Sequence, residues 1–246
     1  MSKDEILEKL KDDDNYYGQF GKQWLSNSDI SALLNNPREF QKRNEGTNPA
    51  FLVGGYFHTA ILEPHKLDNY KVCDVSSRNS KTYRDLKEPA ILQKEVDNIL
   101  QMKKTLEACN ETRNLIYPLF DDGSIEYEVP GITELYDVGW KGKADILNHS
   151  EKLIVDLKTT GDILKFRQSA SKYNYDSQAY IYRKLFGYDL VFVAIDKTTH
   201  QIGIFECEES FYDRGEMKVE RAIDVYNQWQ DKDFDPEQAF IYESLN

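Results

Sequence analysis

The chain has 246 residues, with 43 acidic and 31 basic side chains that give a formal net charge of −12. Its 40% hydrophobic and 13% aromatic residues suffice for a packed core, which excludes wholesale disorder and fits one large or two small domains. No apolar run approaches the ~18 residues of a membrane span, and the mixed charges of residues 1–14 are unlike a secretion signal.

The first half of the chain predicts helices with one short strand. The double glycine Gly54-Gly55, inside an apolar helix, predicts a close backbone approach, because each glycine costs ~1 kcal/mol there. The expected segments are a helix beginning near Ser26 or Ser28, a short helix at Pro37, a helix over 48–62, a strand over 70–75, and one long or two broken helices over 82–114. The last of these is expected to bury Leu92, Val96, Ile99, Leu100 and Leu106.

The second half alternates with period two and then returns to helices. The expected order is strands over 124–129, 135–147 and 152–158, helices over 161–170 and 174–186, a hairpin over 189–195 and 201–207, and an acidic helix over 209–230. This order predicts one α/β (α+β) domain with a mostly antiparallel strand run and no domain boundary. Within residues 1–246 we expect an N-terminal extension (1–24), a core (25–200) and an acidic C-terminal hairpin strand and helix (201–246).

The cysteines and the charge distribution bear on which metal sites and which ligands the protein can bind. Cys73, Cys109 and Cys207 form no C-x-x-C pair, which argues against thiolate zinc or iron–sulfur sites and predicts free thiols in a reducing cytoplasm. Taken as a sum, the net charge opposes nucleic-acid binding. However, residues 1–14 carry −3 and residues 201–246 carry −8, whereas residues 141–172 carry +3. We therefore expect a positive face in the middle of the chain, with the acidic end pointing away from it.

A predicted hairpin between 135–147 and 152–158 gathers carboxylates and lysines. If the turn lies near Ser150-Glu151, Asp145 faces Asp156 across the strands, and Lys158 shares the face of Asp156. Two adjacent carboxylates repel each other unless a cation lies between them, and Mg²⁺ prefers oxygen ligands. Such an ion polarises a phosphodiester, and a nearby lysine can act on the attacking water. The pattern favours metal-assisted phosphodiester hydrolysis, although solvated surface residues would give the same D-x-K tripeptide.

Five segments resemble the PD-(D/E)xK nuclease superfamily, and more narrowly the nuclease domain of exodeoxyribonuclease VIII (RecE) and its phage relatives. The same set is similar to RecB-type nuclease domains. The proline of the superfamily motif is replaced by Ala144. The segments, which together span about residues 25–195, are LSNSDISALLNNPREF (25–40), Gly54–Pro64, Gly142–Asp145, Ile154–Thr160 and Tyr175–Tyr182. The resemblance implies a restriction-endonuclease-like core, in which a mixed sheet with a catalytic antiparallel hairpin is flanked by helices.

The resemblance also implies roles for individual residues. Lys158 would act on the attacking water, and Gln178 and Tyr182, four apart on a helix, would orient the lysine, the water or the DNA backbone. An acid on the preceding strand would join the site, and the sequence leaves open whether this is Glu126 or Glu128. The implied ligands of Mg²⁺ or Mn²⁺ are His58, Asp145, Asp156 and the backbone carbonyl of Leu157, with Glu63 holding His58 or a second ion.

Residues around these motifs are expected to bind DNA. The segment 76–87 combines four basic residues with Tyr83, a composition that can grip a strand through phosphate contacts and stacking. The expected DNA-binding residues are Lys141, Lys143, Thr159, Thr160 and Lys165 near the hairpin, and Arg78, Lys81 and Arg84 in that segment.

The first functional hypothesis is a Mg²⁺- or Mn²⁺-dependent exonuclease. By resemblance it would degrade linear double-stranded DNA 5′→3′ in a bacterial host, leave a 3′ single strand for a recombination annealing protein, and form a ring-shaped homo-oligomer without contacting a membrane. One alternative is an endonuclease or end-processing nuclease in defence, CRISPR adaptation or repair, which the absence of a four-cysteine cluster disfavours. Another is a non-catalytic interaction protein that binds a basic partner through 201–246. Strand polarity, exo- or endonuclease mode, metal count and oligomer size stay open.

Overall fold

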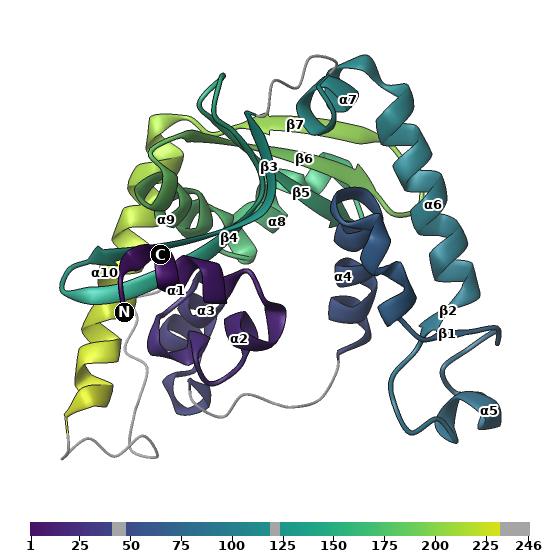
Figure 1. Ribbon diagram of the computed structural model, residues 1–246, viewed down its shortest axis with the longest axis horizontal. Helices are drawn as coiled ribbons and strands as arrows, with labels where there is room; N and C mark the ends of the chain where they lie inside the picture. The colour runs from purple at the N-terminus through teal and green to yellow at the C-terminus, as the bar shows by residue number, and fades with distance from the viewer. Residues whose placement is uncertain (41–47, 119–123, 232–246) are drawn as a thin grey trace.

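The computed structural model describes residues 1–40, 48–118 and 124–231 (Figure 1). The helices are α1 (Lys3–Leu10), α2 (Asp13–Tyr17), α3 (Asn27–Asn35), α4 (Pro49–Leu62), α5 (Lys81–Arg84), α6 (Gln93–Ala108), α7 (Asn110–Ile116), α8 (Phe166–Lys172), α9 (Tyr175–Phe186) and α10 (Glu209–Gln230). The strands are β1 (Val72–Cys73), β2 (Ile91–Leu92), β3 (Ile125–Leu135), β4 (Val138–Asn148), β5 (Leu153–Thr160), β6 (Asp189–Asp196) and β7 (Ile202–Glu206). Short 3-10 turns cover Gly21–Gln23, Pro37–Glu39, Pro64–Asn69 and Ile163–Lys165.

The main sheet has five strands in the order β3-β4-β5-β6-β7. β5 and β6 run parallel, and the other neighbouring pairs are antiparallel. The parallel pair needs a crossover connection, which α8 and α9 supply. The predicted mixed sheet flanked by helices is confirmed, and the turn between β3 and β4 uses left-handed Tyr136 and Asp137, with φ of 55° and 62°.

Helices cover both faces of this sheet and form two cores. One core holds Ile30 of α3, Ile181 of α9 and Val219 of α10, packed on one face. The other holds Phe57 of α4 and Ile99 of α6, packed on the opposite face (Figure 1). The catalytic candidates of the hairpin therefore lie between two helical layers. No helix of the described residues is both long and apolar enough to cross a membrane.

The acidic helix α10 packs against α9 and α3. The contact with α9 is close at Gly215, where an added Cβ would lie 2.2 Å from the carbonyl oxygen of Asp176. This packing holds α9, which carries Gln178 and Tyr182, against the sheet. The rest of the acidic C-terminal segment, residues 232–246, lies outside the described part of the chain.

Several sequence-based expectations need correction. The segment 82–92 is helical only within the short α5, after which the chain forms β2, so the predicted long helix begins at Gln93. Leu100 was expected in the core but is 41% exposed. Of the Gly54-Gly55 pair, an added Cβ at Gly54 would meet no atom within 4 Å, whereas one at Gly55 would lie 3.1 Å from the Tyr70 hydroxyl, so the predicted close approach is found at Gly55 alone and involves a side chain. Ser26 is the observed N-cap of α3.

Candidate active site

A cavity of about 740 Å³ opens where β4 and β5 diverge. These strands pair only from Ile146–Val155 to Asn148–Leu153. This confirms the predicted register, in which Asp145 and Asp156 oppose each other just beyond the last pair. Instead of a further ladder bond, the backbone N–H of Leu157 donates to Asp145 Oδ2 at 2.7 Å. Both carboxylates thus line the cavity at the point where the sheet opens.

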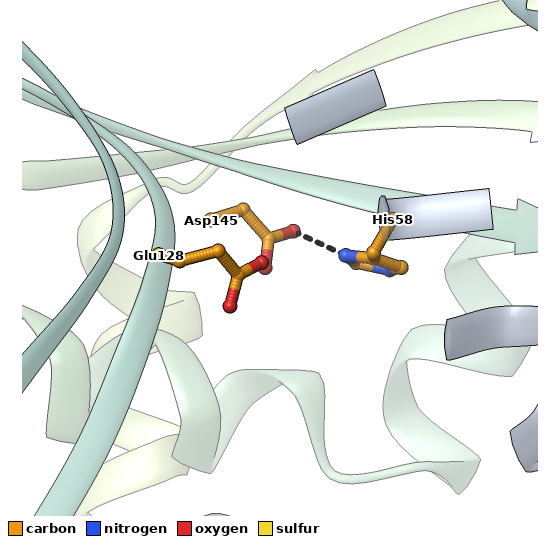
Figure 2. Close-up of side chains that lie close together, drawn as sticks. All are labelled: His58, Glu128 and Asp145. Carbon is orange, nitrogen blue, oxygen red and sulfur yellow. Dashed lines mark ion pairs between the residues drawn. The ribbon is translucent and has the colours of Figure 1, made fainter. Parts of the chain in front are cut away.

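A reversal of side-chain direction in β3 and β4 turns Glu128 and Asp145 into this cavity. Tyr127 and Ile146 pack into the core beneath α4 and α6, whereas Val129 and Ala144, two positions along each strand, pack into the core on the other face. Regular alternation would keep such residues on one face. The reversal coincides with Glu128, whose φ of 53° is left-handed. The bent strands thereby place two carboxylates together (Figure 2).

His58 approaches this carboxylate pair from α4, across the cavity. Its Nδ1 lies 3.2 Å from Asp145 Oδ2 (Figure 2). One ligand atom from each of His58, Glu128 and Asp145 falls within 4.8 Å of the others. Burial by itself lowers the pKa of His58, but the neighbouring Asp145 carboxylate outweighs it and the net pKa is raised.

Asp156 lies on the other side of the opening, facing α9. The Gln178 amide Nε2 donates to Asp156 Oδ2 at 2.6 Å. Asp156 Oδ1 is buried and contacts the Lys158 ammonium, its partner among the described residues. A buried carboxylate oxygen that already faces a cationic side chain is also a suitable ligand for a metal cation, which would compete with Lys158 for it.

The acid–base balance of the cluster points the same way. Burial, then the charge of Asp145, raises the pKa of Glu128 to about 7. Burial also raises the pKa of Asp156 to about 6, against the opposing effect of Lys158. For Asp145, burial is outweighed by His58, Lys158 and the Leu157 N–H, and its pKa is lowered. The three carboxylates repel one another, so the site disfavours having all three ionised at once. A bound divalent cation would offset this repulsion.

The donor set fits a hard divalent cation. Carboxylate oxygens are the ligands that Mg²⁺ and Mn²⁺ prefer, and the cluster adds one imidazole but no thiolate. His58, Glu128 and Asp145 would form one side of such a site, and Asp156 Oδ1 the other. Glu63, a predicted ligand, lines the same cavity, but its carboxylate pairs with Lys66 at 2.7 Å.

Replacing Glu128 by glutamine is expected to flatten the pH dependence of stability in the metal-free protein. A carboxyl whose pKa is about 7 in the folded state but near 4.5 when unfolded stabilises the fold while protonated, and this contribution is lost as pH rises through 7. The melting temperature in EDTA should therefore fall from pH 6 to pH 8, and less steeply in Glu128→Gln. His58, with a raised pKa, changes stability in the same direction, so some dependence persists.

The matched control is Glu126→Gln, on the same strand. Glu126 is outside the cavity lining and pairs with His149 at 2.6 Å. It should keep the wild-type profile and the wild-type rise in melting temperature on adding Mn²⁺, whereas Glu128→Gln should reduce that rise. Equal behaviour of the two variants would remove Glu128 from the site.

The other predicted site residues have structural partners. The Tyr182 hydroxyl donates to the carbonyl oxygen of Lys143 at 2.8 Å, which ties α9 to β4. Lys141 and Lys143 are 3% and 9% exposed, and both contact the N-terminal helix α2. The backbone N–H of Leu157 donates to Asp145, and the binding of a metal ion by its backbone carbonyl oxygen stays a prediction.

The residues expected to bind DNA outside the hairpin do not gather at this cavity. Arg78 forms two hydrogen bonds of 2.7 Å with Glu95, so its guanidinium is used within the fold. Lys81 and Arg84 lie exposed on α5, and Lys165 is exposed beside Asp162, at 3.1 Å. Thr160 is buried, while Thr159 lines a second cavity between α4 and α6.

The cavity itself is not positive, contrary to the expectation for this region. Three lysines line it against five carboxylates, namely Asp13, Glu63, Glu128, Asp145 and Asp156. The excess of acid suits a cation. No residue of α10 lines the cavity, so the described part of the acidic C-terminal region lies away from it. Sequence reasoning missed Asp13, Tyr16 and Tyr17, which carry no local motif and come from the N-terminal extension.

Comparisons with known proteins agree with the fold described above. A family model described as a PDDEXK-like domain of unknown function (DUF3799) matches residues 23–244. The fold is similar to the crystal structure of a candidate exonuclease from Eubacterium rectale, with 17% sequence identity, a TM-score of 0.63 and 96% of each chain covered. A phage related exonuclease from Haemophilus somnus 129PT is similar at 16% identity over 84% of this chain and 94% of that chain, with a TM-score of 0.37. No curated protein matches the chain.

Proposed function

The chain belongs to this family of PDDEXK-like domains, and on that premise we propose that it is a divalent-metal-dependent exonuclease acting on linear double-stranded DNA. The observation that carries the proposal is the cluster of His58, Glu128 and Asp145 with Asp156 and Lys158 opposite. This cluster lies in a cavity large enough for a nucleotide, where the sheet opens.

The residues of the chain divide the chemistry among them. A bound Mg²⁺ or Mn²⁺ would polarise the scissile phosphodiester and acidify a water molecule. His58, Glu128, Asp145 and Asp156 would hold the ion, and Gln178 fixes the Asp156 carboxylate through its Oδ2. Lys158, in contact with the other oxygen of Asp156, is positioned to orient the attacking water and stabilise negative charge on the phosphate.

The finer parts of the proposal have narrower support. The choice of an exonuclease rests on the similarity of the sequence motifs to RecE-like nucleases. The same resemblance is the sole support for 5′→3′ polarity, for a ring-shaped oligomer and for transfer of the 3′ strand to an annealing protein. An endonuclease would use the same residues and differ in substrate topology.

The decisive experiment compares three DNA substrates with purified protein. Linear duplexes labelled at the 5′ or the 3′ end, and a covalently closed circle, are incubated with Mg²⁺, with Mn²⁺ or with EDTA. We expect metal-dependent release of nucleotides from linear duplex, with the 5′ label lost first, and an intact circle. Cleavage of the circle would replace the exonuclease by an endonuclease, and no cleavage of any DNA would overturn the proposal.

A further inference from the structure

The N-terminal helix α2, which follows α1, closes one side of the active-site cavity. Both helices precede residue 23, where the match to the PDDEXK-like family begins. Figure 1 shows them, in purple, beside the β3–β4 hairpin. Asp13, Tyr16 and Tyr17 of α2 line the cavity together with Asp145 and Asp156. This wall of the cavity therefore comes from residues that precede the region matched by the family model.

The Asp13 carboxylate of this wall lies between two lysines. Its Oδ1 contacts Lys143 Nζ, and its Oδ2 lies 3.8 Å from Lys66 Nζ. Lys143 precedes Asp145 by two residues on β4, and Lys66 follows α4, which carries His58. Lys143 is therefore the main partner of this carboxylate, and Lys66, which pairs more closely with Glu63 at 2.7 Å, is the second cationic group beside it.

Tyr16 strengthens the contact between α2 and β4. Its carbonyl oxygen accepts a hydrogen bond from Lys141 Nζ. Its ring lies 4.3 Å from Lys141 Nζ and 4.7 Å from Lys143 Nζ, within the range of cation–π attraction. The short helix α2, which has five residues, thereby contacts two lysines of the strand that carries Asp145.

We propose that α2 is an internal substrate mimic, in which Asp13 occupies a phosphate subsite formed by Lys143 and Lys66. This rests on the proposed function, because it assigns a DNA phosphodiester as the competing ligand. A carboxylate and a phosphodiester each present one negative charge on two oxygens, so both suit the same pair of ammonium groups. DNA binds at this subsite only after Asp13 has left it, which weakens the apparent affinity by the fraction of protein in the open state.

The burial of α2 suits an exchange of this kind. Leu10, at the end of α1, is fully buried, and Tyr16 of α2 is 7% exposed, so buried side chains before and within α2 anchor it next to the cavity. The Asp13 side chain itself is 51% exposed. A half-exposed ion pair is weak enough for a phosphate to displace, while the anchor keeps the carboxylate ready to return.

The test compares Asp13→Asn with Asp14→Asn. Asp14 is the next residue of α2, is exposed and does not line the cavity, so its replacement makes the same change of net charge. Binding of a fluorescein-labelled duplex is measured in EDTA, and kcat/KM is measured with Mg²⁺. Asp13→Asn should bind about two- to fivefold more tightly than Asp14→Asn, the range expected for a partly exposed ion pair.

A second pair of variants shows whether the gain passes through Lys143. In a Lys143→Gln background, Asp13→Asn should bind the labelled duplex no more tightly than Asp14→Asn does, because the subsite is already lost. Equal affinities of Asp13→Asn and Asp14→Asn in the wild-type background, or weaker binding by Asp13→Asn, would overturn the mimic. If the wild-type protein neither binds nor cleaves DNA, the proposed function itself fails, which is a different result.

Discussion

Replacing Asp156 by asparagine is expected to reduce metal-dependent DNA hydrolysis by about 10³-fold or more. A metal ion contributes several kcal/mol to stabilising the charge of the transition state, and each 1.4 kcal/mol is about tenfold in rate. Asp156 lines the cavity, and its Oδ1 contacts the Lys158 ammonium, so Oδ1 is the oxygen at which a metal cation would join or replace that contact. An amide has no negative charge to offer in its place.

The fold should survive this substitution. Burial holds the pKa of Asp156 at about 6, so its ionised form is costly in the metal-free protein, and a neutral amide removes that cost. Asparagine also keeps an oxygen that can accept from Gln178 Nε2, as Asp156 Oδ2 does. However, the amide leaves the Lys158 ammonium without the Asp156 charge, so the melting temperature in EDTA should fall, and a cooperative unfolding transition well above the assay temperature separates loss of chemistry from loss of structure.

The measurements are nucleotide release from linear duplex and Mn²⁺ binding by calorimetry. The control is Asp137→Asn, the same change at the exposed β3–β4 turn, where the left-handed φ of 62° also suits asparagine. We expect Asp137→Asn to match the wild type in both assays, and Asp156→Asn to lose both metal binding and hydrolysis. Full activity in Asp156→Asn would place the metal elsewhere.

The sequence predicted the pairing of Asp145 with Asp156 because that relation is local. A tight turn near residues 150–151 fixes the register of the hairpin, and the observed pair Ile146–Val155 keeps it. Lys158 follows from the alternation of side chains along β5. The same features form the recognisable motif, so local geometry and resemblance led to the same three residues.

The choice between Glu126 and Glu128 could not be made from alternation. Both have the same parity, which predicts one face for both, but the left-handed φ of Glu128 coincides with a reversal of that face. Glu126 points instead to His149. Such a reversal depends on how the strands bend between two helical layers. The left-handed position is occupied by Glu128 and not by a glycine, so the sequence gives no local sign of it.

The fate of Lys141 and Lys143 was hidden for a different reason. Their partners Tyr16 and Asp13 are 125 and 130 residues away in sequence. Counting charges in the window 141–172 treats those lysines as free. In the fold, Lys141 donates to the carbonyl oxygen of Tyr16 and Lys143 donates to the carboxylate of Asp13. The local charge pattern therefore predicted a positive face that tertiary contacts from the acidic N-terminus neutralise.

Replacing Lys158 by methionine is expected to lower kcat by about 10²- to 10⁴-fold, the range for a group that moves a proton or stabilises charge in the transition state. Burial alone would lower the pKa of Lys158, but Asp156 and Asp145 outweigh it and the net pKa is raised. The side chain is thus an ammonium at neutral pH, which favours orientation of water and charge stabilisation over action as a base. The rings of Tyr175 and Phe192, 4.9 and 5.7 Å from Nζ, hold it in place.

Metal affinity should move the opposite way, which makes this prediction specific. The Lys158 ammonium contacts Asp156 Oδ1 and so competes with a cation for that oxygen. Lys158→Met should bind Mn²⁺ at least as tightly as the wild type while kcat falls and KM changes little. The control Lys165→Met removes an exposed lysine that pairs with Asp162 and should leave kcat and Mn²⁺ affinity unchanged. A parallel loss of metal binding and kcat in Lys158→Met would mean that Lys158 shapes the metal site and takes no direct part in the reaction.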